Sequence, residues 1–176
     1  MDRPTPLITA EAIAARVGEL GQLITRDYRG KPLLLVGVLD GAFVFLADLC
    51  RQVDLPLDLD FVCVQSYREG TESNGRPALT RDLTRPVAGR DVLIVEDIVD
   101  TGLTADFLWK LLGTRGASSL ALCALLRKKG RAIRDVPVEY LGFEVPDRFI
   151  VGYGLDHAQR YRNLPYLAVL ERPSSD

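Results

Sequence analysis

Three acidic residues stand close together in the segment VLIVEDIVDTGLTADFL, residues 92–108. Glu96 and Asp97 end an apolar run, Asp100 follows, and a short Thr-Gly turn then opens a predicted helix. Free backbone N–H groups at a helix start bind anions, and a glycine lets a ligand approach the main chain closely. The turn at residues 101–104 therefore predicts a phosphate site directly beside three carboxylates.

A carboxylate beside a phosphate repels it, at a cost of about 4 kcal/mol for charges ~4 Å apart at an effective dielectric constant of about 20. The arrangement is favourable only if the acids face another part of the ligand. Carboxylates suit sugar hydroxyls and Mg²⁺, so the motif predicts a ligand with a phosphate on the turn and a ribose on the acids. The alternative is an ordinary strand end with Asp100 as a helix N-cap, a common role for a single aspartate.

The composition limits the class of protein. The chain has 176 residues, 47% of them apolar and 26% charged, with a formal charge of −2. This length suits one domain with a sizeable core, and no basic field indicates a nucleic-acid partner. No apolar run approaches the ~20 residues that cross a bilayer, and the first residues lack the layout of a secretory signal. We therefore expect a cytoplasmic protein with no nucleic-acid or membrane partner.

The cysteines and the histidine carry little chemistry. Cys50, Cys63 and Cys123 have apolar neighbours and form no CxxC pair, which predicts buried, reduced thiols. His157 is the only histidine, so a two-histidine metal motif is absent and a Ser–His–Asp site would depend on that residue alone.

Strand-like and helix-like segments alternate around the acidic motif. Strands are predicted at residues 32–39, 57–64, 91–97 and 118–126, and helices at 9–27, 42–53 and 103–116, followed by short strands in the last third. This order predicts an α/β domain with a mainly parallel sheet, whose ligands bind at the carboxyl ends of the strands. Residues 65–83 show no periodicity, and so long a gap is usually functional or disordered.

Several segments together resemble one family. VLIVEDIVDTGLT resembles the phosphoribosyl-pyrophosphate (PRPP) binding motif of type I phosphoribosyltransferases, and GVLDGAFVFLADL resembles their pyrophosphate loop. QSY resembles the start of the mobile catalytic loop, while LLRKK and GFEVPDRFIVGYGLDHAQRYRNLPYLAVL resemble the purine-binding end of the hypoxanthine-guanine branch. The resemblance covers about residues 33–170.

The resemblance implies the type I phosphoribosyltransferase fold: a mainly parallel central sheet flanked by helices, with a small hood. It implies a single domain over residues 1–176, with a mobile loop at about 65–83 and a purine-binding part at about 128–170. The implied activity is purine salvage: transfer of 5-phosphoribose from PRPP to N9 of a 6-oxopurine, hypoxanthine or guanine, giving IMP or GMP and pyrophosphate. Mg²⁺ would be the cofactor, and the chain would form a homodimer or homotetramer.

The resemblance also implies a role for each matching residue. Asp100 would be the general base or acid at purine N7. The 5′-phosphate and ribose would be held by Glu96, Asp97, Asp100, Thr101, Gly102, Leu103 and Thr104, and the pyrophosphate by Leu39, Asp40, Gly41 and Arg162. Lys128 at the 6-oxo group, Phe149 stacked on the base, the backbone of Ile150, and Asp156 would bind the purine. The metal would lie near Glu96, Asp97 and Asp156, and Ser66 and Tyr67 would close over the reaction.

Ordinary structural roles remain as alternatives. Phe149 and Ile150 could belong to the core, Arg162 could pair with a surface acid, and Ser66 and Tyr67 could be plain loop residues. Lys128 could be a solvated residue in the turn RKKGR, with Arg127 or Lys129 as the functional neighbour.

The sequence departs from the family pattern at Asp40, where a basic residue is frequent, and at Gln65, where a lysine is frequent. The resemblance also implies a cis peptide bond before Asp40. Two other functions stay open: a regulator of the same fold that binds nucleotides and RNA, and a non-catalytic PRPP-binding scaffold.

Overall fold

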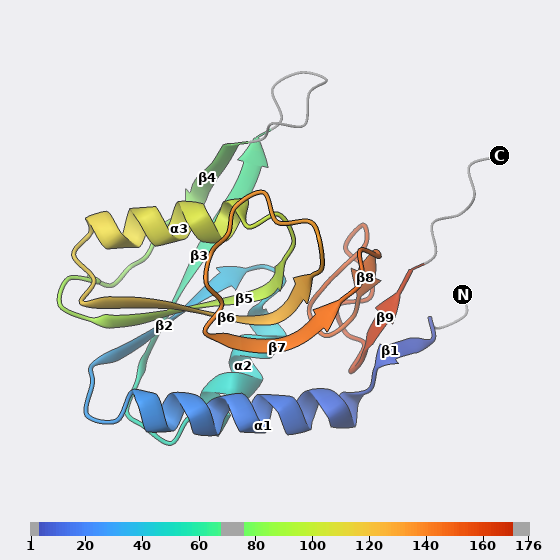
Figure 1. Cartoon of the computed structure of the whole chain (residues 1–176), viewed down its shortest axis with the longest axis horizontal. Helices are drawn as coiled ribbons and strands as arrows, with labels where there is room; N and C mark the ends of the chain where they lie inside the picture. Colours follow the sequence, from blue (N-terminus) through green and yellow to red (C-terminus); the bar gives the residue numbers. More distant parts are fainter. Residues whose placement is uncertain (1–3, 68–75, 171–176) are drawn as a thin grey trace.

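The computed structural model describes residues 4–67 and 76–170. Its centre is a six-stranded sheet in the order β4-β3-β2-β5-β6-β7, in which β4 alone runs antiparallel to its neighbour (Figure 1). The strands are β2 (Leu33–Leu39), β3 (Asp58–Tyr67), β4 (Arg76–Arg81), β5 (Asp91–Val99), β6 (Ser119–Lys128) and β7 (Tyr140–Val145). The predicted α/β class with a mainly parallel sheet is confirmed.

Helices cover both faces of this sheet. Helices α1 (Ala10–Asp27) and α2 (Phe43–Gln52) lie on one face and α3 (Leu103–Thr114) on the other (Figure 1). The side chain of Thr9 caps α1 as predicted, accepting a hydrogen bond from Ala12 N at 3.3 Å. Because the central strands are buried from both sides, β2 and β5 are nearly continuous apolar runs.

A small antiparallel sheet forms the hood beside the main sheet. It contains β1 (Pro6–Ile8), β9 (Leu167–Val169) and β8 (Ile150–Val151), in that order. Pairing of β1 with β9 joins the two ends of the described chain (Figure 1). Sequence analysis did not predict β1, because three residues are too few to show a period.

The segment 65–83 is more regular than predicted. β3 continues through Tyr67 and pairs with the edge strand β4, with Ser66 opposite Pro77. The expectation of a structureless segment is therefore wrong at both of its ends. The polar residues of this edge hairpin give no apolar alternation, which explains the error. Residues 68–75, where the rest of the expected mobile loop falls, lie outside the described residues.

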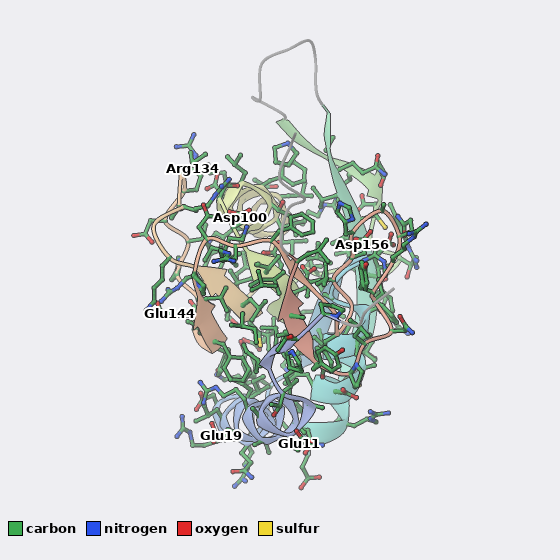
Figure 2. The ribbon with its side chains drawn as sticks, turned by 90° about the vertical axis from the view of Figure 1, so that its right-hand side faces the viewer. Glu11, Glu19, Asp100, Arg134, Glu144 and Asp156 are labelled. Atoms are coloured by element: carbon green, nitrogen blue, oxygen red, sulfur yellow. The ribbon has the colours of Figure 1, made fainter. Side chains whose placement is uncertain are left out.

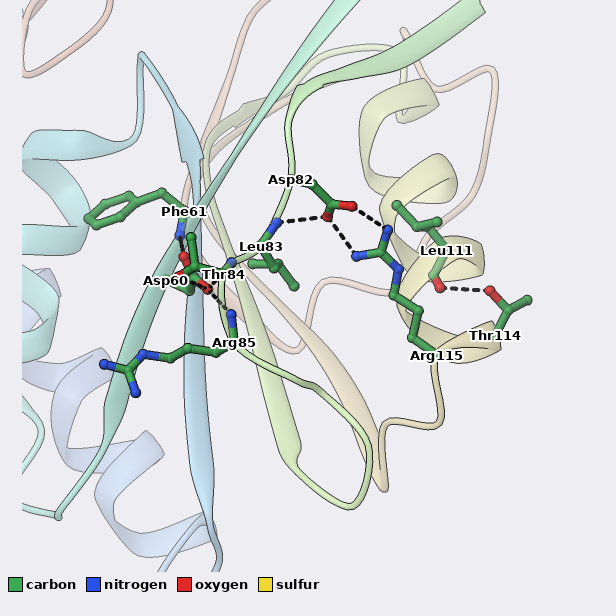
Figure 3. A network of polar contacts seen from close by, with 9 residues as sticks. All are labelled: Asp60, Phe61, Asp82, Leu83, Thr84, Arg85, Leu111, Thr114 and Arg115. Atoms are coloured by element: carbon green, nitrogen blue, oxygen red, sulfur yellow. Dashed lines mark hydrogen bonds and ion pairs between the residues drawn. The ribbon is translucent and has the colours of Figure 1, made fainter.

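The segment LDLDFVCV, residues 57–64, alternates apolar and polar residues like a half-buried strand, but the start of β3 does not bury its leucine. Leu59 is exposed, whereas Asp60 is only 3% exposed. The carboxylate of Asp60 accepts hydrogen bonds from Phe61 N, from Thr84 N and Oγ1, and from Arg85 N, at 2.7 to 3.1 Å (Figure 3). Three of these donors, from Thr84 and Arg85, belong to the segment after β4, which sequence periodicity could not bring next to β3.

The prediction for the cysteines is partly wrong. All three thiols are free, as expected, and Cys123 is buried. Cys50 and Cys63 are instead partly exposed, because α2 and β3 each leave one side open to solvent.

Candidate active site

The acidic pair at the end of β5 is buried in a way that suits a cation. Glu96 is only 4% exposed, and its Oε1 has no hydrogen-bond partner among the described residues. Burial, together with the charge of Asp97, raises the pKa of Glu96 to about 8. Burial also raises the pKa of Asp97 to about 6, although Ile98 N–H donates to it at 2.9 Å. Since a bound cation would relieve both costs, the pair fits a divalent metal.

The predicted phosphate turn follows directly. Helix α3 begins at Leu103, and its N-cap is Gly102 with φ +79°, a left-handed conformation that favours glycine. A Cβ at Gly102 would lie 2.3 Å from the carbonyl oxygen of Arg134. Gly102 provides no side-chain cap, and in the described chain Leu103 N makes only a long hydrogen bond, 3.5 Å, to Thr101 Oγ1. N–H groups of this helix start are therefore available to an anion. The alternative role of Asp100 as N-cap is therefore wrong.

Asp100 instead contacts two cations. Its Oδ2 lies 3.2 Å from Lys128 Nζ, and its Oδ1 lies 2.9 Å from Arg131 Nε. Both cations also reach Asp147: Lys128 at 3.5 Å and Arg131 at 3.2 Å. Four charged side chains from three separate segments thus form one cluster.

The strand β6 decides which of its basic residues can serve the site. Lys128 is mostly buried and points toward Asp100, whereas Arg127 and Lys129 both pair with Glu144. Figure 2 shows Glu144 at the outer edge of the molecule and Asp100 further in. Because side chains alternate along a strand, neither neighbour faces Asp100, and the alternative of a one-residue shift is not supported.

The loop after β2 packs onto the acids. The Leu39–Asp40 peptide bond is cis, as the resemblance implies. A Cβ at Gly41 would lie 1.7 Å from Asp97 Oδ2, so only glycine allows this loop to lie against Asp97. Arg162 approaches from the hood: it donates to Gly154 O at 2.7 Å and pairs with Asp156 at 2.9 Å and with Asp40 at 3.9 Å. Two of the site's acids are thereby linked by one guanidinium.

Phe149 and Ile150 have different surroundings. Phe149 is 39% exposed, and its ring meets the edge of His157 at 5.3 Å between centroids. Core packing is therefore the wrong interpretation of Phe149. Ile150 is buried in the main core, so its side chain does have the core role, and only its main chain is left for a ligand.

One cavity of about 340 Å³ unites most of the predicted residues. Its lining consists of Asp40, Gly41, Asp97, Ile98, Asp100, Lys128, Phe149, Ile150, Leu155, Asp156 and Arg162. Asp100 and Asp156 lie on the opposite side of the molecule from Glu11 and Glu19 of α1 (Figure 2). The carboxyl ends of the strands thus form a site, as the sheet topology predicts.

Other predicted residues adjoin this cavity or stay undescribed. Leu39, Glu96, Thr101, Gly102, Leu103 and Thr104 do not line it. Ser66 and Tyr67 belong to β3, which argues against plain loop residues, but the structure describes only their main chain.

Three further charged residues that line an adjoining pocket, Arg131, Asp147 and Arg148, were not predicted from the sequence. The only available signal was their nearness in sequence to Lys128 and Phe149. Sequence analysis also missed Ile98 and Leu155 of the cavity lining, which carry no chemical signature.

The comparison with known proteins agrees with this geometry. The family model described as the phosphoribosyl transferase domain matches residues 7–158.

The chain belongs to the phosphoribosyltransferase family.

Two curated members of this family illustrate the similarity. The hypoxanthine phosphoribosyltransferase of Salmonella typhimurium is 48% identical over 163 residues, covering 92% of each chain. The hypoxanthine-guanine phosphoribosyltransferase of Mycobacterium bovis is 46% identical, covering 97% of this chain and 87% of its own. Both carry enzyme names, which does not favour the regulator alternative.

Solved structures of this phosphoribosyltransferase family share the fold. The crystal structure of a Staphylococcus aureus hypoxanthine phosphoribosyltransferase superimposes with a TM-score of 0.91 at 44% identity, covering 95% of this chain and 91% of that one. The type I phosphoribosyltransferase fold predicted from the motifs is therefore confirmed.

Two absences concern only the described residues. No three His, Cys, Asp or Glu side chains within residues 4–67 and 76–170 are placed to hold a metal ion together. No helix in the same ranges is both long and apolar enough to cross a membrane.

Proposed function

We propose that this phosphoribosyltransferase serves purine salvage, transferring 5-phosphoribose from PRPP to N9 of hypoxanthine or guanine and releasing pyrophosphate. The observation that carries the proposal is the single cavity in which the acids after β5 meet Lys128, Phe149, Asp156 and Arg162. Relatives named hypoxanthine or hypoxanthine-guanine phosphoribosyltransferase, 46–48% identical over most of the chain, support the same activity.

The substrates would occupy this cavity together with the residues that flank it. We assign the 5′-phosphate to the free N–H groups and hydroxyls of residues 101–104, and the ribose hydroxyls to Glu96 and Asp97. The pyrophosphate would lie against the loop Leu39–Gly41 and Arg162. Since Arg162 lies 3.9 Å from Asp40, the unusual acid at that position has a cation to offset its repulsion of the pyrophosphate.

We assign Mg²⁺ as the cofactor, held near Glu96, Asp97 and Asp156. Mg²⁺ retains waters and binds through one or two carboxylates and substrate phosphates, which agrees with the absence of a three-ligand cluster in the described ranges. Bound there, it supplies positive charge that stabilises the leaving pyrophosphate.

The protein's own residues would position the reaction. Phe149 stacks on the base and Lys128 donates to its 6-oxo group, so N9 is directed at the sugar C1 carbon. Asp100, within reach of purine N7, accepts or returns the proton there as N9 becomes bonded. Ser66 and Tyr67 would exclude water, which would otherwise hydrolyse PRPP.

The direct test is an ultraviolet assay with PRPP, Mg²⁺ and, separately, hypoxanthine, guanine, xanthine, adenine and uracil. Turnover with hypoxanthine or guanine, and little with adenine, is expected. A folded sample that converts none of the bases would overturn the proposal and favour the scaffold alternative. The cytoplasmic location, the dimeric or tetrameric state and the single-domain organisation remain predictions.

A further inference from the structure

The segment after β6 reaches both halves of the site. In this segment the side chain of Arg131 lies against Asp100, with Arg131 Nε 2.9 Å from Asp100 Oδ1. Its backbone groups Ile133 N and Arg134 N donate to the carbonyl oxygen of Thr101 at 2.9 and 3.1 Å. We call residues 130–134 the strap. Because the strap is hydrogen-bonded to the phosphate turn, the guanidinium that it carries is held at a defined place relative to Asp100.

The charged cluster divides its donors unevenly. Lys128 Nζ contacts Oδ2 of Asp100 and Oδ1 of Asp147, whereas Arg131 contacts Oδ1 of Asp100 and both oxygens of Asp147. Lys128 therefore shares each acid with Arg131, and only at Asp100 do the two cations contact different oxygens. An ammonium group has three N–H donors, so this sharing leaves one N–H of Lys128 for a ligand in the cavity.

Stability does not explain this arrangement. Arg131 is 45% exposed and both acids are partly exposed, and ion pairs in such surroundings contribute about 1 kcal/mol or less. Arg131 does, however, hydrogen-bond to Asp147 and lie in ion-pair contact with Asp100, whose Oδ1 has no hydrogen bond in the described chain. Its charge thereby constrains where the Asp100 carboxylate lies. One of these carboxylates lines the cavity beside Lys128, so orientation is the property that matters there.

We propose that Arg131 is a positioning residue for phosphoribosyl transfer. It holds the carboxylate of Asp100 toward purine N7, and by sharing Asp100 and Asp147 with Lys128 it leaves an N–H of Lys128 free to donate to the base. The inference rests on the proposed function. It predicts that loss of Arg131 slows the chemical step while PRPP binding, assigned to the phosphate turn and Arg162, is preserved.

The test compares three variants in steady-state assays with hypoxanthine and PRPP. Arg131→Ala should lower kcat about tenfold with the KM for PRPP changed less than about twofold, since a misdirected carboxylate loses part of the ~10²- to 10⁴-fold contribution of proton transfer. Arg131→Lys, which keeps one charged contact, should recover kcat to within about threefold of the unaltered chain. Arg127→Ala is the matched control, because Arg127 is 42% exposed and pairs with Glu144 away from the cavity.

Thermal melting of each variant separates positioning from unfolding, and the melting temperatures of Arg131→Ala and Arg127→Ala should agree. Equal kcat for these two variants, or a loss in Arg131→Ala confined to the KM for PRPP, would overturn the role of Arg131 alone. Absence of turnover in the unaltered chain would overturn the proposed function, and this inference with it.

Discussion

Two buried carboxylates on different strands of the central sheet meet opposite surroundings. Asp60, at the amino end of β3, accepts four hydrogen bonds (Figure 3). Burial by itself would raise its pKa, but these donors outweigh burial and hold the pKa below the usual value. Glu96, near the carboxyl end of β5, has an oxygen with no partner in the described chain, and burial raises its pKa to about 8.

The difference teaches what burial of an acid means. Where the fold supplies the donors, the carboxylate is a structural acceptor that joins two segments of chain. Where the fold withholds them, next to a residue that lines the cavity, the carboxylate retains affinity for a cation or a hydroxyl group from outside. The same sheet thus uses one buried acid for stability and keeps the other for ligand binding.

The largest expected effect comes from removal of Asp60, the carboxylate whose hydrogen bonds the fold supplies. Asp60→Ala should lower the free energy of unfolding by about 3 kcal/mol, because it leaves several buried donors without an acceptor. Asp58→Ala is the control: Asp58 is half-exposed and pairs with Arg90 and Arg85, so its loss should cost less than about 1 kcal/mol. Urea unfolding at neutral pH measures both, and equal losses would contradict the comparison.

The pH dependence of Asp60 has a definite sign. Since its folded pKa is lowered, its contribution is complete above the unfolded value of about 3.9 and is lost as the pH falls through the folded pKa. The difference in stability between the unaltered chain and Asp60→Asn should therefore shrink in acid. A difference that grows in acid would contradict the assigned hydrogen bonds.

The next effect concerns Glu96, whose Oε1 has no hydrogen-bond partner in the described chain. Glu96→Gln should stabilise the metal-free protein by about 2 kcal/mol at about pH 9, because it removes a buried charge. The folded pKa of about 8 lies above the unfolded value, so the unaltered chain is stabilised below about pH 4.3 and loses this stability as the pH rises through 8. Unfolding in a chelator at several pH values measures the gain, which should vanish in acid.

The activity of Glu96→Gln tests the proposed role of Glu96 in binding Mg²⁺. Glu96→Gln should raise the Mg²⁺ concentration that gives half-maximal turnover, since an amide is a poorer ligand than a carboxylate for this cation. A Glu96→Gln protein that is less stable than the unaltered chain at high pH would show that Glu96 has partners in the fold after all.

Substitution of Lys128, the cation beside Asp100, should give a smaller effect. Lys128→Gln should reduce the preference for hypoxanthine over adenine, as a ratio of kcat/KM, by about tenfold, because an amide both donates and accepts whereas an ammonium only donates. Lys129→Ala, on the side chain that pairs with Glu144, should leave the ratio unchanged. If the Lys128→Gln protein still rejects adenine as firmly as its parent, another residue selects the base.

The smallest effect concerns the ion pair between Arg115 and Asp82. Arg115 contacts both carboxylate oxygens of Asp82, at 2.6 and 2.7 Å (Figure 3). Since both side chains are partly exposed, Arg115→Ala should cost less than about 1 kcal/mol in unfolding free energy and leave turnover unchanged. A large loss of turnover would show that this ion pair affects the active site.

The prediction of the fold succeeded where a local pattern and the final environment agree. β2 and β5 are apolar runs because helices cover both of their faces, so composition alone indicated strands. The prediction failed at β1, at β4 and for the buried side of β3. β1 is short and β4 is an edge strand, and in β3 the donors of Thr84 and Arg85 decide that Asp60 is buried.

The sequence by itself determined the chemical parts of the site: acids at the end of β5, a Thr-Gly turn able to expose N–H groups, and a basic residue at the end of β6. Local spacing suffices there, because a strand followed directly by a turn must place these groups together. Only the tertiary structure decided that Lys128 rather than Arg127 or Lys129 faces Asp100, that Arg131 and Asp147 complete the cluster, and that Asp60 is satisfied while Glu96 is not. The reason is physical: the partners of these charges come from segments far apart in the chain, and the sheet order alone brings them within hydrogen-bonding distance.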